Sequence, residues 1–127
     1  PMRPEVPDLS LTPLTDEAGL DAALAHSYRE PILLFKHSRW CGISHRVRED
    51  VLQAAAARSV PVYEVVVQTA RPVSDAIARR LGIRHETPQA FVIYQGQVFF
   101  HASHYAITPD ALNKTLDQLD RADSSAG

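Results

Sequence analysis

The 127-residue chain has one cysteine, no long apolar run and little excess charge. One cysteine excludes an internal disulfide framework. No segment approaches the ~18 apolar residues of a membrane span. With 15 acidic and 13 basic residues, the chain has no basic excess to bind nucleic acid. The N-terminal prolines and acids do not resemble a secretory leader. We therefore expect one cytoplasmic domain, monomeric, that contacts neither membrane nor nucleic acid.

Hydrophobic periodicity predicts strands and helices in the order β-α-β-α-β-α-β-β-α. Such an order is typical of an α/β fold of the thioredoxin-like kind, with a central mixed sheet flanked by helices. We expect a flexible arm over 1–10, one domain over 11–121 and a polar tail over 122–127. The strands are predicted over 11–14, 32–36, 62–67, 91–94 and 97–101, and the helices over 15–27, 41–58, 73–81 and 109–121.

Five signals define the ends of these elements. Thr15 or Asp16 is predicted to cap the first helix, and Thr108 the last. For the third helix, Ser74 or Asp75 is predicted as the cap, and Gly82 as the stop. The dipeptide Gln95-Gly96 indicates a tight hairpin between the last two strands.

The single cysteine lies where a buried strand ends and the longest helix begins, in Lys36-His37-Ser38-Arg39-Trp40-Cys41-Gly42-Ile43-Ser44. Unpaired N–H groups and the helix dipole at such a position favour a thiolate, the reactive form of cysteine. Ser44 stands at i+3, where a dithiol redox motif has its second cysteine. The pattern therefore indicates a redox site with one thiol, whose chemistry passes through a partner's sulfur. A small buried cysteine without chemistry is the alternative.

Four neighbours of Cys41 are candidate supporting residues. Trp40 could shield the site or pack on a partner, or lie partly buried at the sheet edge. Gly42 gives the turn freedom and leaves an N–H free to donate to a thiolate. Ser44 could hydrogen-bond Cys41, or serve as a helix cap or first-turn residue. A protonated His37 close by would favour the thiolate.

The chain resembles the monothiol bacilliredoxin family from about Leu14 to Leu119. The resemblance implies that Cys41 removes bacillithiol from S-thiolated proteins as a mixed disulfide, with bacillithiol as co-substrate and no tightly bound cofactor. Gly42 departs from the proline usual in that family, and Trp40 is also unexpected. The matching blocks are residues 35–38 with Cys41-Gly42-Ile43-Ser44, Arg71-Pro72-Val73-Ser74, Gly82-Ile83-Arg84-His85-Glu86-Thr87-Pro88-Gln89 and His101-Ala102-Ser103-His104.

Thr87-Pro88 is the second landmark of the expected site. In thioredoxin folds, the proline before this strand is cis and faces the redox cysteine. The free backbone of the preceding residue then receives a substrate segment as an added strand. An ordinary trans proline that opens a strand is the alternative.

Lys36, Arg39, Arg46 and Arg84 are candidates to hold the malate carboxylates of bacillithiol, because basic side chains pair with carboxylate oxygens. For each of them alone, a solvated surface charge is the better interpretation. We expect no metal site. His101 and His104 lie at a strand end, and neither they nor His37 and His45 complete a tetrahedral set with Cys41.

Two other functions remain open. Cys41-Gly42-Ile43-Ser44 resembles the Cys-Gly-Phe-Ser of monothiol glutaredoxin-like iron–sulfur carriers. The glycine pair and aspartate that those carriers have after the hairpin are missing here. A thioredoxin-fold binding module with an inert cysteine is the remaining possibility.

Overall fold

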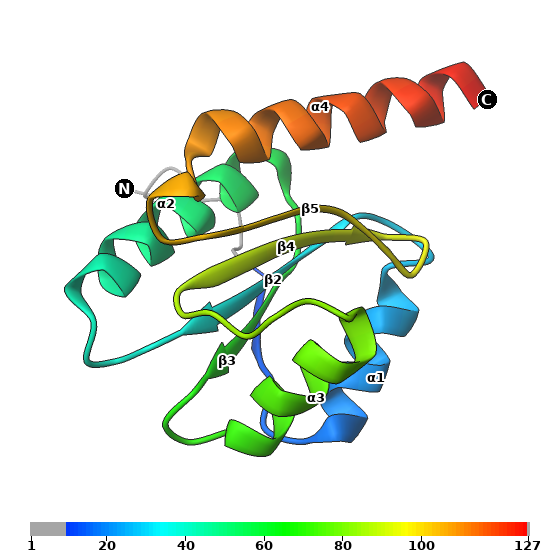
Figure 1. Ribbon diagram of the computed structural model, residues 1–127. Coiled ribbons are helices and arrows are strands. Elements are labelled where there is room, and N and C mark those ends of the chain that lie inside the picture. Colours follow the sequence, from blue (N-terminus) through cyan, green and yellow to red (C-terminus); the bar gives the residue numbers. More distant parts are fainter. Residues whose placement is uncertain (1–9, 127) are drawn as a thin grey trace, which may run out of the picture.

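The computed structural model describes residues 10–126, in which strands and helices alternate in the predicted order (Figure 1). Of the expected N-terminal arm, only Ser10 lies among the described residues. The strands are β1 (Leu11–Pro13), β2 (Ile32–His37), β3 (Val62–Val66), β4 (Gln89–Tyr94) and β5 (Gln97–Ser103). The helices are α1 (Glu17–His26), α2 (Gly42–Arg58), α3 (Arg71–Leu81) and α4 (Pro109–Ala126), with a 3₁₀ turn, η1 (His104–Ala106), before α4.

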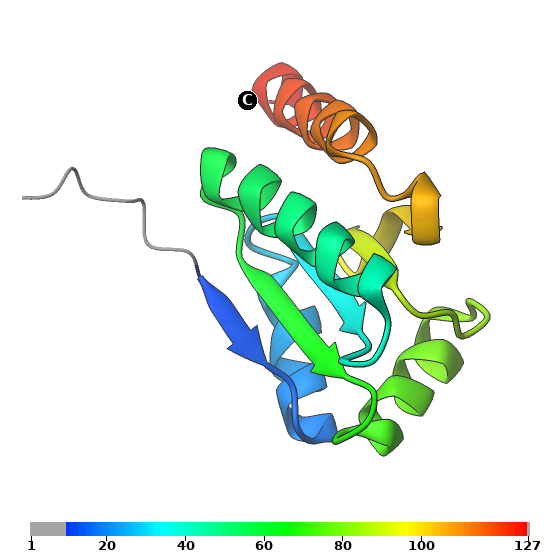
Figure 2. The same cartoon turned by 90° about the vertical axis from the view of Figure 1, so that its left-hand side faces the viewer.

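The five strands form one mixed sheet in the order β1-β3-β2-β4-β5. Both β1 and β2 run parallel to β3, whereas β4 runs antiparallel to its neighbours β2 and β5. Helices α2 and α4 cover one face, and α1 and α3 cover the other (Figures 1 and 2). The predicted fold class is therefore confirmed. Because β2 is the central strand, the turn that follows it lies in the middle of one sheet edge.

The central strand β2 is buried along its whole length, as its apolar sequence predicts. Leu33 and Phe35 pack into the core under α2 and α4. Ile32 and Leu34 pack into the second core, under α1 and α3. The same alternation directs Lys36 to the face of α1 and α3, and His37 to the face of α2 and α4.

Two helix ends differ from the prediction. Helix α3 begins at Arg71 rather than near Val73, and Ser74 is buried within it instead of capping it. Pro72 accounts for the early start, because the first helical turn tolerates a proline that lacks an N–H. Helix α4 continues to Ala126, through most of the expected polar tail, since no proline or glycine interrupts the sequence there.

Strand β4 begins two residues earlier than predicted and β5 ends two residues later, whereas the other predicted caps, the helix stop and the hairpin turn are confirmed. Asp16 caps α1 by accepting a hydrogen bond from Gly19 N at 2.8 Å, and Thr108 Oγ1 accepts one from Ala111 N in the first turn of α4. Gly82 ends α3 with a left-handed φ of 66°. The β4–β5 hairpin turns at Gln95-Gly96, both at positive φ.

Candidate functional site

Cys41 is the N-cap residue of α2, with an extended backbone of φ −110° and ψ 117°. Its side chain is half-buried and makes no capping hydrogen bond. Gly42 follows as the first residue of the helix and is exposed. The first turn of α2 contains no acidic residue. The only sulfhydryl of the chain therefore lies at a helix N-terminus, where the backbone dipole stabilises a negative charge.

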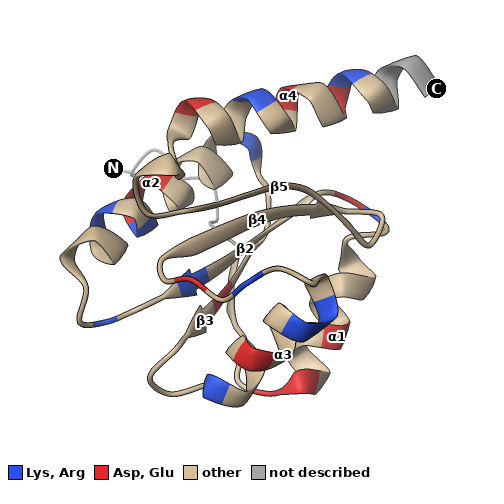
Figure 3. Cartoon of the chain, in the orientation of Figure 1, with Lys and Arg blue, Asp and Glu red and all other residues tan. Residues whose placement is uncertain are grey.

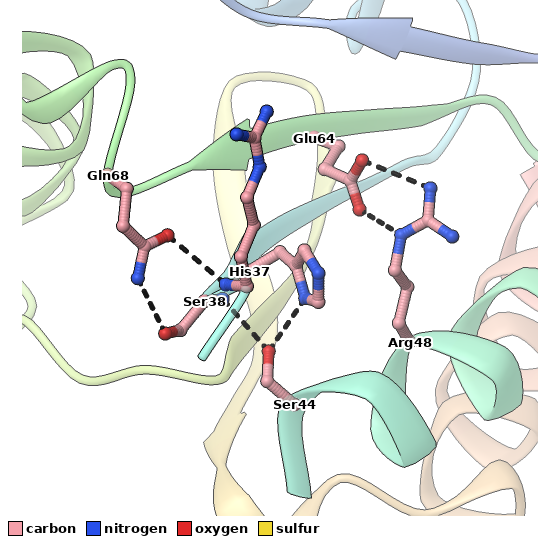
Figure 4. A network of polar contacts seen from close by, with 7 residues as sticks. His37, Ser38, Ser44, Arg48, Glu64 and Gln68 are labelled. Carbon is pink, nitrogen blue, oxygen red and sulfur yellow. Dashed lines mark hydrogen bonds and ion pairs between the residues drawn. The ribbon is translucent and has the colours of Figure 1, made fainter. Parts of the chain in front are cut away.

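Three backbone groups of the turn before Cys41 hydrogen-bond to side chains from other parts of the chain (Figure 4). Ser38 N donates to Ser44 Oγ at 3.0 Å, and Arg39 N donates to Gln68 Oε1 at 3.1 Å. The Arg39 carbonyl oxygen lies 2.8 Å from His45 Nε2. These three hydrogen bonds give the exposed turn a defined path.

Gln68 and His45 are therefore site residues that the sequence did not reveal. Gln68 also donates from Nε2 to Ser38 Oγ at 2.8 Å, so its amide spans the turn. It belongs to the loop between β3 and α3, and no spacing relates it to Cys41. His45 is exposed on α2, and nothing in the sequence pattern relates it to the Arg39 carbonyl.

The predicted hydrogen bond from Ser44 to Cys41 is wrong. Ser44 is buried in the first turn of α2, and its Oγ binds His37 Nδ1 at 2.7 Å as well as Ser38 N (Figure 4). Its interpretation as a first-turn residue is confirmed, and its role is to tie the end of β2 to the start of α2.

We predict that Ser44→Ala lowers the free energy of unfolding by about 1–3 kcal/mol, because Ser38 N and His37 Nδ1 lose a buried partner. Urea denaturation measures this change. Ser103→Ala is the control, since the Ser103 side chain makes no capping hydrogen bond where it precedes η1. An equal loss in both variants would contradict this role of Ser44.

His37 does not supply the expected positive charge. Its ring is buried, stacks on Phe35 and meets the His45 ring edge at 4.8 Å between centroids. Burial lowers the pKa of His37 below its ordinary 6.5, and this effect outweighs the opposing attraction of Glu64. The imidazole is therefore neutral at pH 7, and its contribution is packing and the bond to Ser44.

An ion pair connects α2 to β3 beneath the turn (Figure 4). Arg48 Nε lies 2.5 Å from one oxygen of Glu64, and its Nη2 lies 3.2 Å from the other. Glu64 is buried, so the two-point geometry compensates its charge inside the protein. The pair fixes the helix that carries Cys41 against the sheet.

Trp40 is 83 % exposed, so the interpretation as partial burial at the sheet edge is wrong. A second exposed aromatic, Tyr105, is in η1, and it lines a hollow together with Gly42 and Arg46. Two large aromatic side chains thus flank the N-terminus of α2 without being buried. Exposed aromatics beside a reactive group are suited to contact a partner protein.

The peptide bond between Thr87 and Pro88 is cis, as expected for this fold. Thr87 lines a hollow that Ser38 of the cysteine turn also lines. Gln89 points the other way and is buried, with Nε2 donating to the Arg84 carbonyl oxygen at 3.0 Å. Of the two residues that flank Pro88, Thr87 is therefore the one on the cysteine side.

The four basic candidates do not share one location. Arg46 lines the hollow beside Tyr105, whereas Arg84 lines another hollow beside Glu86. Arg39 is exposed in the cysteine turn. Lys36 is 0 % exposed, which contradicts its interpretation as a solvated surface charge. An arginine that was not predicted, Arg71, lines the hollow shared by Ser38 and Thr87.

Basic and acidic residues are interspersed along α2, α3 and α4 (Figure 3). Within residues 10–126, no three metal-binding side chains come together, and no helix is long and apolar enough to cross a membrane. His101 and His104 do not form a pair: His104 Nδ1 lies 3.9 Å from a carboxylate oxygen of Glu86 instead.

We predict that Gly42→Pro raises the free energy of unfolding by about 0.4–1 kcal/mol. A Cβ at Gly42 meets no atom within 4 Å, and the extended backbone of Cys41 suits a following proline. The same change removes the Gly42 N–H, so the reaction of Cys41 with a disulfide should slow several-fold. Gly42→Ala, which keeps the N–H, is the control, and equal rates in the two variants would rule out a role for this donor.

The sequence matches the family model of the monothiol bacilliredoxin BrxC over residues 12–112. Among solved structures, the chain is similar to one described as a suggested oxidoreductase with a thioredoxin fold. The two are 24 % identical with a TM-score of 0.78, and the match covers 84 % of this chain and 93 % of that chain. It is also similar to thioredoxin from Trypanosoma brucei brucei, at 13 % identity and a TM-score of 0.71, with 95 % and 98 % covered.

A poplar thioredoxin h mutant is a further structural relative, at 20 % identity and a TM-score of 0.70, with 94 % of this chain and 90 % of that chain covered. These likenesses establish the thioredoxin fold. The family match covers most of the chain and includes Cys41 and Thr87-Pro88. Together, the family and the fold indicate a thiol oxidoreductase. The chain belongs to the monothiol bacilliredoxin BrxC family.

Proposed function

We propose that this protein removes bacillithiol from S-bacillithiolated proteins, with Cys41 as the nucleophile. One observation carries the proposal: the only cysteine of the chain lies at the N-terminus of α2, half-buried, in a turn held by hydrogen bonds. Thiol–disulfide exchange needs a sulfur that is accessible and stabilised as a thiolate. The family match supports bacillithiol as the small thiol.

The reaction has two exchanges. The Cys41 thiolate attacks the bacillithiol sulfur of the mixed disulfide, a new S–S bond forms, and the substrate protein leaves as a thiolate that takes a proton from water. A second bacillithiol, as thiolate, then attacks the Cys41 adduct, and bacillithiol disulfide leaves while Cys41 is restored. The second molecule is required because Ser44, at the position of a resolving cysteine, has no sulfur.

The partners follow from this chemistry. The substrates are S-thiolated proteins, which dock beside the exposed Trp40 and Tyr105, and bacillithiol is a co-substrate rather than a bound cofactor. We propose that the protein acts as a monomer in the cytoplasm, where small thiols are kept reduced, with no role for nucleic acid or membrane.

Mass spectrometry of the reduced protein tests the function. After separate incubations with bacillithiol disulfide, glutathione disulfide and coenzyme A disulfide, we expect one adduct on Cys41, formed fastest with bacillithiol disulfide. Free bacillithiol should then remove it. A faster reaction with another disulfide would identify a different small thiol as the co-substrate. The absence of any adduct would contradict the function. Absorbance after reconstitution with iron and sulfide tests the alternative function as an iron–sulfur carrier, which would require a bound cluster.

A further inference from the structure

A hollow of about 320 Å³ lies beside the cysteine turn on the α3 side of the sheet. Its walls come from the turn itself (Ser38), the β3–α3 loop (Gln68), the first turn of α3 (Arg71) and the residue before the cis proline (Thr87). Cys41 is the third residue after Ser38, so their Cα atoms are at most about 11 Å apart. A small molecule joined to the Cys41 sulfur is therefore within reach of this hollow.

A buried positive charge lies behind the wall of the hollow. Lys36 follows Leu34 on the α1 and α3 face of β2, and its Nζ lies 3.1 Å from Nδ1 of His85, which lines the hollow. The described residues provide no carboxylate that forms an ion pair with Lys36. Buried ammonium groups ordinarily have such a partner. Asp75 acts on the Lys36 ammonium without forming an ion pair with it, so this charge has no direct carboxylate partner among the described residues.

The geometry also sets the proton position on His85. Nδ1 accepts from Lys36, and Ser74 Oγ lies 3.3 Å from the same nitrogen. Burial, and then the charge of Lys36, lower the pKa of His85 below 6.5, so the ring is neutral at pH 7 with its proton on Nε2. A donor rather than an acceptor therefore remains on the ring.

The balance of charge around the hollow favours an anion. Arg71 contributes one positive charge at the wall, and Lys36 contributes a second behind it. Asp75 also lines the hollow and opposes them with one negative charge. The net charge of these three groups is positive, so one carboxylate entering the hollow would neutralise it. Arginine suits this ligand because its planar donors match the two carboxylate oxygens.

We propose that this hollow binds a carboxylate of the small thiol while its sulfur is exchanged at Cys41, with Arg71 as the direct ligand and the Lys36–His85 pair as supporting charge and donor. This inference rests on the proposed function and names the part of the site that selects the small thiol. Of the basic residues that the sequence suggested as carboxylate ligands, Lys36 lies behind this hollow, whereas Arg46 and Arg84 line two other hollows.

The test compares an anionic with a neutral disulfide. Reduced protein is mixed with bacillithiol disulfide or with 2-hydroxyethyl disulfide, and adduct formation on Cys41 is followed by mass spectrometry. We expect Arg71→Gln to slow the reaction with bacillithiol disulfide about five- to tenfold and that with the neutral disulfide less than twofold. Lys36→Met should show the same selectivity, with a slower reaction with bacillithiol disulfide and little change in the rate with the neutral disulfide. Arg79→Gln, at the far end of α3, is the matched control.

A direct titration with malate complements the kinetics. Binding should shift the backbone amide resonances of Ser38, Gln68 and Arg71 in the wild type and not in Arg71→Gln. Equal slowing with both disulfides, or the same effect in Arg79→Gln, would overturn the carboxylate site while leaving the proposed function intact. If neither disulfide forms an adduct, the proposed function is wrong, and the titration alone decides whether this hollow binds the anion.

Discussion

Cys41→Ala is expected to abolish the release of bacillithiol from an S-bacillithiolated protein, down to the uncatalysed rate. The chain has no other cysteine, so no second thiol can accept the small thiol. Because the first exchange forms a bond to this sulfur, no other side chain of the site replaces it. Release of the small thiol from a thiolated protein, followed by mass spectrometry over time, measures the effect.

Two controls make this result specific. Cys41→Ser retains the size and polarity of the side chain, so its inactivity would assign the loss to the sulfur rather than to a disturbed turn. Far-ultraviolet circular dichroism should be unchanged in both variants. Activity that survives in Cys41→Ala would refute the assignment of the site, and with it the carboxylate site beside the turn.

Lys36→Met is expected to raise the free energy of unfolding at pH 7 by about 1–3 kcal/mol. Burial lowers the pKa of Lys36 from 10.5 to about 8, although the charge of Asp75 acts in the opposite direction. The ammonium is thus less stable in the folded protein than in the unfolded chain. Methionine has a similar length and carries no charge into the same buried position.

The stability difference between Lys36→Met and the wild type should depend on pH. Between about pH 8 and 10.5, the unfolded wild type binds more protons at Lys36 than the folded protein, so its stability rises with pH relative to the variant. The advantage of Lys36→Met should therefore shrink across this window. Urea denaturation at pH 7 and pH 10 measures this stability difference. Lys114→Met is the control, because Lys114 is exposed. A constant difference between the two pH values would contradict a buried, destabilising charge.

The predicted stability of Lys36→Met and the proposed carboxylate site both depend on the buried charge of Lys36. A buried lysine that costs stability and forms no ion pair inside the protein is explained if a ligand supplies a carboxylate partner. A variant that is more stable but slower with the anionic disulfide would show both properties together. The rate with a neutral disulfide separates this effect from a general change in the turn.

Local patterns in the sequence were enough to predict most of the fold. The apolar run at β2, the cap at Asp16, the stop at Gly82 and the hairpin at Gln95-Gly96 each depend on neighbouring residues. The start of α3 was predicted two residues late, because Ser74 resembles a cap by composition while the helix begins before Pro72. Such errors occur where two local signals compete.

The sequence by itself determined the single thiol, its place between strand and helix, and the proline that precedes β4, since these depend on order along the chain. Only the tertiary structure decided the partners of the polar side chains. It buried Lys36, neutralised His37 and assigned Ser44 to the turn rather than to Cys41. It also brought Gln68 and Arg71 to the cysteine turn, because parallel β2 and β3 end at the same sheet edge. Desolvation and contacts between distant segments set these properties, and neither is encoded in local spacing.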